Sequence, residues 1–134
     1  MGHKRNCCDA YVTIWAEQNG AISTNNWNYS WGNGNEQAGT GDPIDWGYVT
    51  HYPYEIVSLT IGSRLSNTAD TEAEITVNGQ TVGQSVIIAG TSTKAVNNNI
   101  TYSGSAGDTL NFRTLQVGGG NDVVVSALIK YRIP

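Results

Sequence analysis

Residues 123–133 read Val-Val-Val-Ser-Ala-Leu-Ile-Lys-Tyr-Arg-Ile and contain the most regular pattern in the chain. Alternate residues are apolar on one side: Val123, Val125, Ala127, Ile129, Tyr131 and Ile133. A period of two is typical of a β-strand with one buried face. The opposite side holds Val124, Ser126, Leu128, Lys130 and Arg132, so it begins apolar and ends basic. Such a strand lies in the middle of a sandwich or contacts another subunit.

The same alternation continues toward the N-terminus. Val57, Leu59 and Ile61 alternate with polar residues, and so do Ala73, Ile75 and Val77. The second of these runs ends at Asn78-Gly79, the strongest two-residue hairpin signal. Eight or nine such strands are expected, separated by turn-forming segments. The spacing predicts an all-β fold, a two-sheet antiparallel jelly-roll sandwich over residues 11–134, preceded by an arm at residues 1–10.

Composition agrees with this fold class. Of the 134 residues, 39 % are hydrophobic and 13 % charged, and Gly, Asn, Thr and Ser together make up two-fifths of the chain. These four residue types favour turns over helices. The net charge of −4 argues against general nucleic-acid binding. Because of this charge, no nucleic acid is expected as a partner. No apolar run is long enough for a membrane span or a signal peptide, so no membrane is expected as a partner either.

The two cysteines are neighbours, Cys7 and Cys8. They lack the spacing of a disulfide framework or a zinc site. Two reduced thiols are expected, as in a protein assembled in a reducing cytoplasm, with an intersubunit bridge as the alternative.

Catalysis has little support in the sequence. The histidines are His3 in the arm and His51 beside Tyr52, and no nucleophile elbow, phosphate loop or zinc-protease motif is present. We therefore expect no enzyme and no cofactor, although eleven acidic residues leave a glycosidase-type carboxylate pair open. Asp42 and Asp45 could offer oxygen ligands to calcium, but Asp42 before Pro43 is more typical of a turn, and no metal site is expected.

Aromatic residues are concentrated in the first 54 positions. Trp15, Trp27 and Trp31 occupy positions with a period of two and are expected in the core. Trp46 and Tyr48 lie among Gly and Asn residues, where a flat ring could stack on a sugar. They are the candidate glycan-binding residues.

Several segments resemble the jelly-roll domains of bacteriophage tail-fibre tips and of other phage surface fibres and knobs. They are Trp15-Ala16-Glu17, Asn19-Gly20-Ala21-Ile22, Asn28-Tyr29-Ser30-Trp31-Gly32-Asn33-Gly34, Gly107-Asp108-Thr109-Leu110-Asn111-Phe112-Arg113 and the strand from Val123 to Lys130. The resemblance covers most of residues 11–133. That group is similar in turn to the trimeric tumour-necrosis-factor-like fold.

The resemblance implies a homotrimer on the virion surface, assembled in the host cytoplasm. Only about ten residues precede the first expected strand, so the chain looks more like a capsid decoration protein than a tail fibre with a shaft. We expect it to be non-enzymatic and to contact the major capsid protein or another virion protein. The expected anchor is His3, Lys4, Arg5, Asn6, Cys7 and Cys8, and the expected trimer interface is Val124, Leu128 and Tyr131. A tail-fibre tip or lectin-like module that recognises host glycans is the alternative.

Overall fold

The computed structural model describes residues 8–21, 26–28, 31–33, 37–38, 47–64, 68–116 and 121–134. Within these ranges the chain forms strands and no helix. The strands are β1 (Asp9–Ala21), β2 (Asn26–Asn28), β3 (Trp31–Asn33), β4 (Gln37–Ala38), β5 (Tyr48–Val49), β6 (Tyr54–Ser63), β7 (Thr71–Val77), β8 (Gln80–Ile88), β9 (Lys94–Asn97), β10 (Tyr102–Gly104), β11 (Thr109–Gln116) and β12 (Asn121–Arg132).

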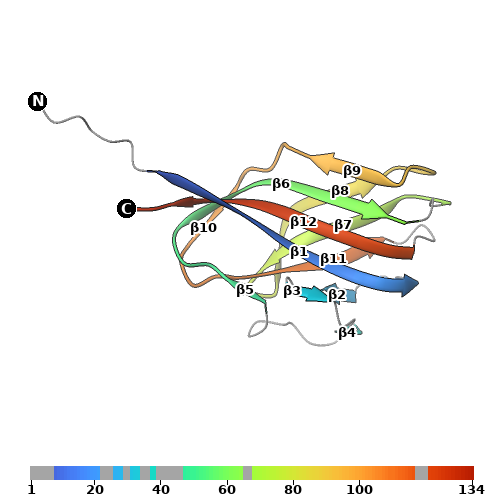
Figure 1. Ribbon diagram of the computed structural model, residues 1–134, viewed down its shortest axis with the longest axis horizontal. Helices are drawn as coiled ribbons and strands as arrows, with labels where there is room; N and C mark the ends of the chain where they lie inside the picture. Colours follow the sequence, from blue (N-terminus) through green and yellow to red (C-terminus); the bar gives the residue numbers. More distant parts are fainter. Residues whose placement is uncertain are drawn as a thin grey trace, which may run out of the picture.

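The strands form two sheets. Sheet A has the order β10-β6-β12-β1-β3, with β9 also paired to β6. Sheet B has the order β4-β2-β11-β7-β8, with β5 also paired to β11. Figure 1 shows β6, β12 and β1 in front of β7, β8 and β11. Pairing is antiparallel except between β1 and β3.

The chain crosses repeatedly between the sheets, from β6 in sheet A to β7 and β8 in sheet B, back to β9 and β10, then to β11 and finally β12. This is the winding of a jelly roll, so the expected all-β, two-sheet class is confirmed. The described residues divide into twelve strands because segments of two or three residues, such as β4 and β5, pair separately from the long strands.

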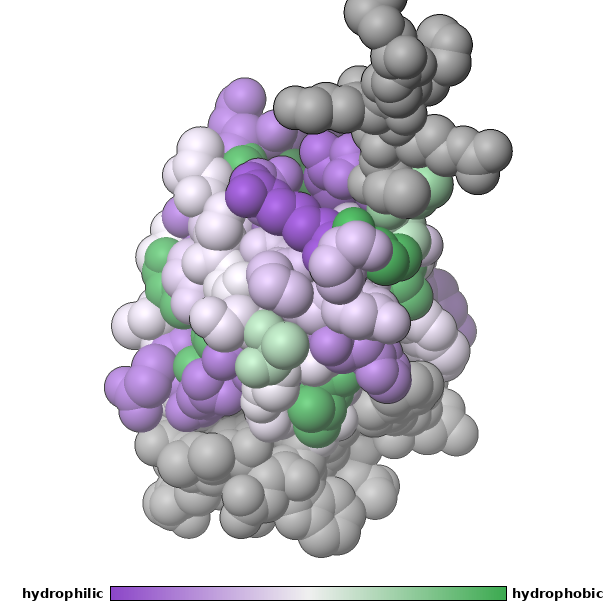
Figure 2. Space-filling model, turned by 90° about the vertical axis from the view of Figure 1, so that its left-hand side faces the viewer, coloured by the Kyte–Doolittle hydropathy of each residue, from purple (hydrophilic) through white to green (hydrophobic). Residues whose placement is uncertain are grey.

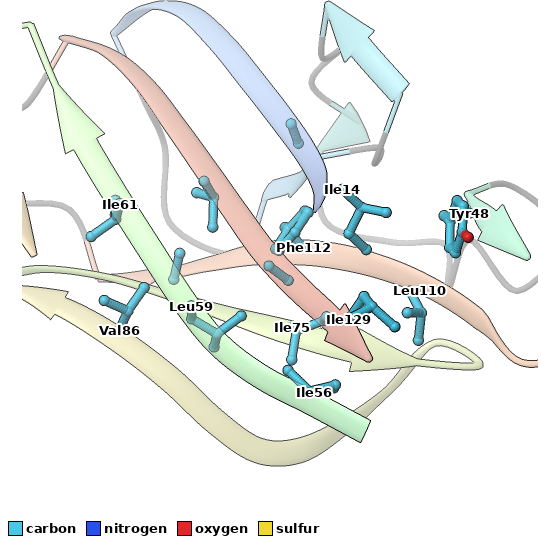
Figure 3. Close-up of a cluster of buried hydrophobic side chains, with 14 of the residues drawn as sticks. Ile14, Tyr48, Ile56, Leu59, Ile61, Ile75, Val86, Leu110, Phe112 and Ile129 are labelled. Atoms are coloured by element: carbon cyan, nitrogen blue, oxygen red, sulfur yellow. The ribbon is translucent and has the colours of Figure 1, made fainter. Parts of the chain in front are cut away.

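The core lies between the sheets, and β12 is central to it. Its residues Val125, Ala127 and Ile129 face inward and are at most 1 % exposed, as the alternation in the sequence predicts. Ile75, Leu110 and Phe112 of sheet B belong to the same buried cluster as these three residues. Figure 3 shows them together with Ile129. Each fully buried side chain of this size contributes about 1.5–3 kcal/mol through removal of apolar surface from water.

The turn between β7 and β8 is the predicted hairpin. Asn78 and Gly79 have φ angles of 52° and 75°. Two consecutive residues with positive φ are typical of a type I′ turn, which matches the twist of the flanking strands. The register Val77↔Gln80 next to this turn therefore follows from the Asn-Gly pair.

The two ends of the described domain lie together. Asp9, the first residue of β1, pairs with Arg132, the last residue of β12. Figure 2 views the end of the sandwich where these residues lie, and hydrophilic or weakly polar colours cover most of the coloured surface. The hydrophobic patches at this end are small and separate. This end of the sandwich is therefore mainly polar.

Candidate interaction surface

The outer face of sheet A, which points away from the core, is set by the register of its strands. Directly opposite residues of paired strands share a face. One row across β1, β12, β6 and β9 is formed by Trp15, Ser126, Thr60 and Val96. The next row is formed by Glu17, Val124, Gly62 and Lys94. These two rows are the middle of the outer face of sheet A.

Large apolar side chains are exposed on this face. Tyr11, Trp15, Val96 and Val124 are each between 42 and 60 % exposed. Trp15 was expected in the core, and this expectation is wrong. Both alternate sets of residues in β1 contain apolar side chains, and it is Ile14 and Ala16 that face the core. Four exposed apolar groups on one face are a feature of contact surfaces.

A shallow hollow opens on the same face beside β12. It is lined by Thr60, Ile61, Gly62, Lys94, Ala95, Val96 and Val124. We call it the Gly62 hollow. A Cβ atom built on Gly62 would meet nothing within 4 Å. The missing side chain at this position therefore leaves open space between Val124 on one side and β9 on the other.

Ion pairs lie on this face at the end where β1 begins. The Lys130 Nζ atom lies 3.1 Å from Asp9 Oδ2 and 4.0 Å from Glu55 Oε2. Arg132 forms an ion pair with the same Glu55 carboxylate. The hydrogen bond to Asp9 is the main cause that raises the pKa of Lys130. These charges join β1, β6 and β12 and leave this end of the face polar.

Tyr131, expected at a trimer interface, is instead buried near the C-terminal end of β12. Its hydroxyl forms a hydrogen bond with the Tyr48 hydroxyl and accepts one from the His51 backbone N–H at 3.4 Å. The Tyr52 and His51 rings meet it edge to face, with centroids 6.0 and 6.4 Å away. Burial, followed by the Tyr48 hydrogen bond, raises the pKa of Tyr131. The side chain therefore stabilises the fold at this end.

Tyr48, a candidate for sugar stacking, is itself only 6 % exposed. Its ring belongs to the same buried cluster and is not available to stack on a sugar. The other candidate, Trp46, lies outside the described residues, as do Asp42 and Asp45. The side chains of Trp27 and Trp31 are likewise outside the described part of the chain.

Asp108 ties the loop before β11 to both sheets. Its carboxylate accepts hydrogen bonds from the Tyr54 hydroxyl at 3.1 Å, the Asn78 side chain at 3.0 Å and the Ser105 backbone N–H at 3.0 Å. Burial, and then the negative charge of Asp108, raises the pKa of Tyr54. Three donors from separate segments hold this carboxylate, so Asp108 is a structural residue that sequence analysis did not identify.

The outer face of sheet B buries its polar groups. Glu74, one of the polar residues that alternate with Ala73, Ile75 and Val77, is 3 % exposed. Its carboxylate pairs with Arg113 of the neighbouring strand and accepts a hydrogen bond of 2.7 Å from the Thr81 hydroxyl. Asn111 on this face is fully buried, and Gly47 lies against it. Around Glu74 and Asn111 this face is covered by the chain itself, whereas Val49 and Ile87 on it are exposed.

The expected anchor residues His3, Lys4, Arg5, Asn6 and Cys7 lie outside the described residues. Cys8 is a free, exposed thiol directly before β1. Among the described residues there is no group of three or more His, Cys, Asp or Glu side chains placed to hold a metal ion. A search of the same residues for a helix long and apolar enough to cross a membrane finds none.

Comparisons with known proteins bear on the fold. No protein-family model matches the chain, and no curated protein sequence does. Among solved structures, the chain is similar to one from the acidic stable capsid structure of Helicobacter pylori bacteriophage KHP30. The two share 8 % sequence identity with a TM-score of 0.50, and the match covers 93 % of this chain and 94 % of that one. At this identity the likeness establishes a shared fold over nearly the whole length of both chains.

Proposed function

We propose that this chain is a non-enzymatic structural protein of a bacteriophage virion. The observation that carries the proposal is the match to a chain of a phage capsid structure over nearly the full length of both. Because the match extends from end to end, it concerns the whole sandwich and not a motif that many β-proteins share. The resemblance of the segments near Trp15 and Val123 to phage surface domains supports the same class independently.

Within this class, we propose a homotrimeric decoration protein on the capsid surface. The outer face of sheet A supports association, since it exposes Val124 and half-exposes Leu128 beside Trp15. Both Val124 and Leu128 are among the residues expected at the interface. On sheet B the outer face buries Glu74 and Asn111, and its exposed apolar residues Val49 and Ile87 lie on strands separated by β11 and β7, which favours sheet A for a neighbouring copy. Capsid contact through the segment His3, Lys4, Arg5, Asn6, Cys7 and Cys8 follows from its basic charge and its place before β1.

Three copies of a weakly binding arm act together when they belong to one trimer. Each additional contact then becomes intramolecular, which raises avidity without any strong single contact. A basic arm suits an acidic surface of the major capsid protein or of another virion protein. This arrangement requires no catalytic site and no cofactor in the chain.

Copy number tests the virion role. Quantitative mass spectrometry of purified particles should find the chain in dozens to hundreds of copies per particle. A few copies would assign it to the tail, and its absence from particles would reject a virion role. Light scattering of the purified chain should give three times the monomer mass, and a monomer at all concentrations would reject the trimer.

Truncation tests the anchor. A chain without residues 2–8 keeps all of β1 and the ion pair between Asp9 and Lys130, so it should fold and assemble normally. It should no longer bind particles that lack the protein. The matched variant Lys4→Gln/Arg5→Gln keeps the arm length and should bind weakly, more so at higher salt. Full binding by the truncated chain would show that the anchor lies elsewhere.

The second candidate is a tail-fibre tip or lectin-like module for host glycans. It is favoured by the aromatic residues concentrated in the first 54 positions. Because the Tyr48 ring is buried, this candidate depends on Trp46. Binding on a glycan array that Trp46→Ala abolishes would support it. An array with no binders, together with unchanged host adsorption of the Trp46→Ala phage, would reject it.

A further inference from the structure

The outer face of sheet A carries a projecting side chain on β1 and a hollow next to β9. Trp15 projects from β1 with 43 % of its surface exposed. In the same row, three strands away, Val96 is exposed at the border of the Gly62 hollow. Neighbouring strands are about 4.8 Å apart, so about 14 Å separates the two strand positions. The face therefore offers an apolar group at one side and an apolar recess at the other.

The charges in the adjacent row follow the same division. Glu17 lies on β1, two residues from Trp15 on the same face. Lys94 lies on β9, opposite Gly62, and lines the hollow. Neither residue has an opposite charge directly across from it, because Val124 and Gly62 stand between them. The side with the projection is thus acidic, and the side with the hollow is basic.

Gly62 has no structural reason to be glycine within one chain. Its backbone does not adopt the positive φ angle that favours glycine, and a Cβ atom there meets open space. Glycine in a strand interior weakens the strand, and it often marks a place where another group approaches closely. Here the open space lies on the outer face, beside an exposed valine. The approaching group therefore comes from outside the chain.

We propose that the Gly62 hollow receives Trp15 of a second copy of this chain, with Glu17 of that copy facing Lys94. The proposal rests on the proposed homotrimer and specifies its contact. Each copy would present Trp15 to one neighbour and its hollow to the other, a head-to-tail contact that closes into a ring of three. A second copy fits because its own face carries the matching shape and the opposite charge.

Two single substitutions test the contact without disturbing the fold. Gly62→Val fills the hollow with a residue that suits a strand, and no atom of the chain stands in its way. Trp15→Ala removes the projection. Each should raise the concentration at which the trimer dissociates at least about tenfold, measured by sedimentation velocity. Ile87→Ala, at an equally exposed position on sheet B (46 %), is the matched control and should leave assembly unchanged.

Exchanging the charges of Glu17 and Lys94 provides the decisive test of the contact. Glu17→Lys and Lys94→Glu should each weaken assembly, because like charges would meet across the contact. The double variant Glu17→Lys/Lys94→Glu should restore it to within a few-fold of the parent chain. This rescue depends on the two side chains meeting between copies.

The outcomes separate the contact from the trimer. A trimer that dissociates as predicted in the single variants and is rescued by the exchange supports the proposal. A trimer unaffected by Trp15→Ala and Gly62→Val overturns the contact and leaves the trimer standing. A dimer that responds to the same variants retains the contact and overturns the ring of three. A chain that stays monomeric overturns both.

Discussion

Removal of Glu74 should destabilise the fold strongly. Glu74 is 3 % exposed, and its carboxylate accepts hydrogen bonds from two partners, the Arg113 guanidinium and the Thr81 hydroxyl. Truncating one member of a buried ion pair costs roughly 3–5 kcal/mol, because the remaining charge loses its partner in a poorly solvated place. The Arg113 side chain is 26 % exposed, and water there offsets part of the loss. We therefore expect Glu74→Ala to lower the free energy of unfolding by about 3 kcal/mol.

Urea unfolding followed by tryptophan fluorescence measures this cost. With an m-value of about 2 kcal/mol/M, a loss of 3 kcal/mol moves the midpoint down by about 1.5 M. The chain offers a matched control in the ion pair between Glu55 and Arg132, where the Arg132 side chain is 62 % exposed. Glu55→Ala should cost less than about 1 kcal/mol, as exposed ion pairs do. All variants are compared at one protein concentration, since the proposed assembly would contribute to stability.

A double substitution separates the charge from the packing. Glu74→Leu/Arg113→Met removes both charges and keeps apolar volume at the site, which is often neutral or stabilising for a buried pair. It should recover at least half of the loss seen for Glu74→Ala. If Glu74→Ala costs no more than Glu55→Ala, or if the double variant is as unstable as the single one, then burial of this ion pair does not make the loss of Glu74 costly.

Three further predictions concern tyrosines and glycines. Burial raises the pKa of Tyr54 and of Tyr131, so the unfolded chain ionises first as the pH rises. The free energy of unfolding should be constant up to about pH 10 and then fall by about 1.4 kcal/mol per pH unit for each tyrosine; Tyr131→Phe should reduce this slope by about 1.4 kcal/mol per pH unit between pH 10 and 11.5, and an unchanged slope would contradict the assignment. Gly104→Ala would place a Cβ atom against the buried Tyr54 hydroxyl and should cost about 1–3 kcal/mol in urea unfolding, whereas Gly62→Ala, facing open space, should cost nothing. Gly79→Ala puts a side chain at a φ of 75° and should lower the thermal midpoint, for a loss of about 1 kcal/mol measured by calorimetry.

The sequence was sufficient for those strands in which a single set of alternate residues is apolar. In β12 the inward set from Val123 to Tyr131 is buried throughout, as the alternation predicts. The hairpin at Asn78 was predictable because the Asn-Gly pair carries its own backbone preference. In these places the local pattern and the packed structure agree.

Period-two analysis is not sufficient where both sets of alternate residues are apolar. In β1 the pattern does not decide between Trp15 and Ile14, and the pairing with β12 places Trp15 outside. Nor does it reveal that a polar position is covered. Glu74 is buried because Arg113 comes from a strand almost forty residues away, and Tyr48 is buried because Tyr131 meets it from the other end of the chain. Contacts at such separations leave no local signal.

The two outer faces of the sandwich differ in how they treat their polar and apolar groups. On sheet B, polar groups such as Glu74 and Asn111 are buried under other parts of the same chain, and Glu74 has its partners there. On sheet A, apolar groups such as Trp15 and Val124 remain exposed, although burial would stabilise them. Sheet B also exposes Val49 and Ile87, but β11 and β7 lie between their strands. On sheet A, Trp15 and Val124 lie in adjacent rows of neighbouring strands, and burial of their exposed apolar surface would favour the association proposed for this sheet.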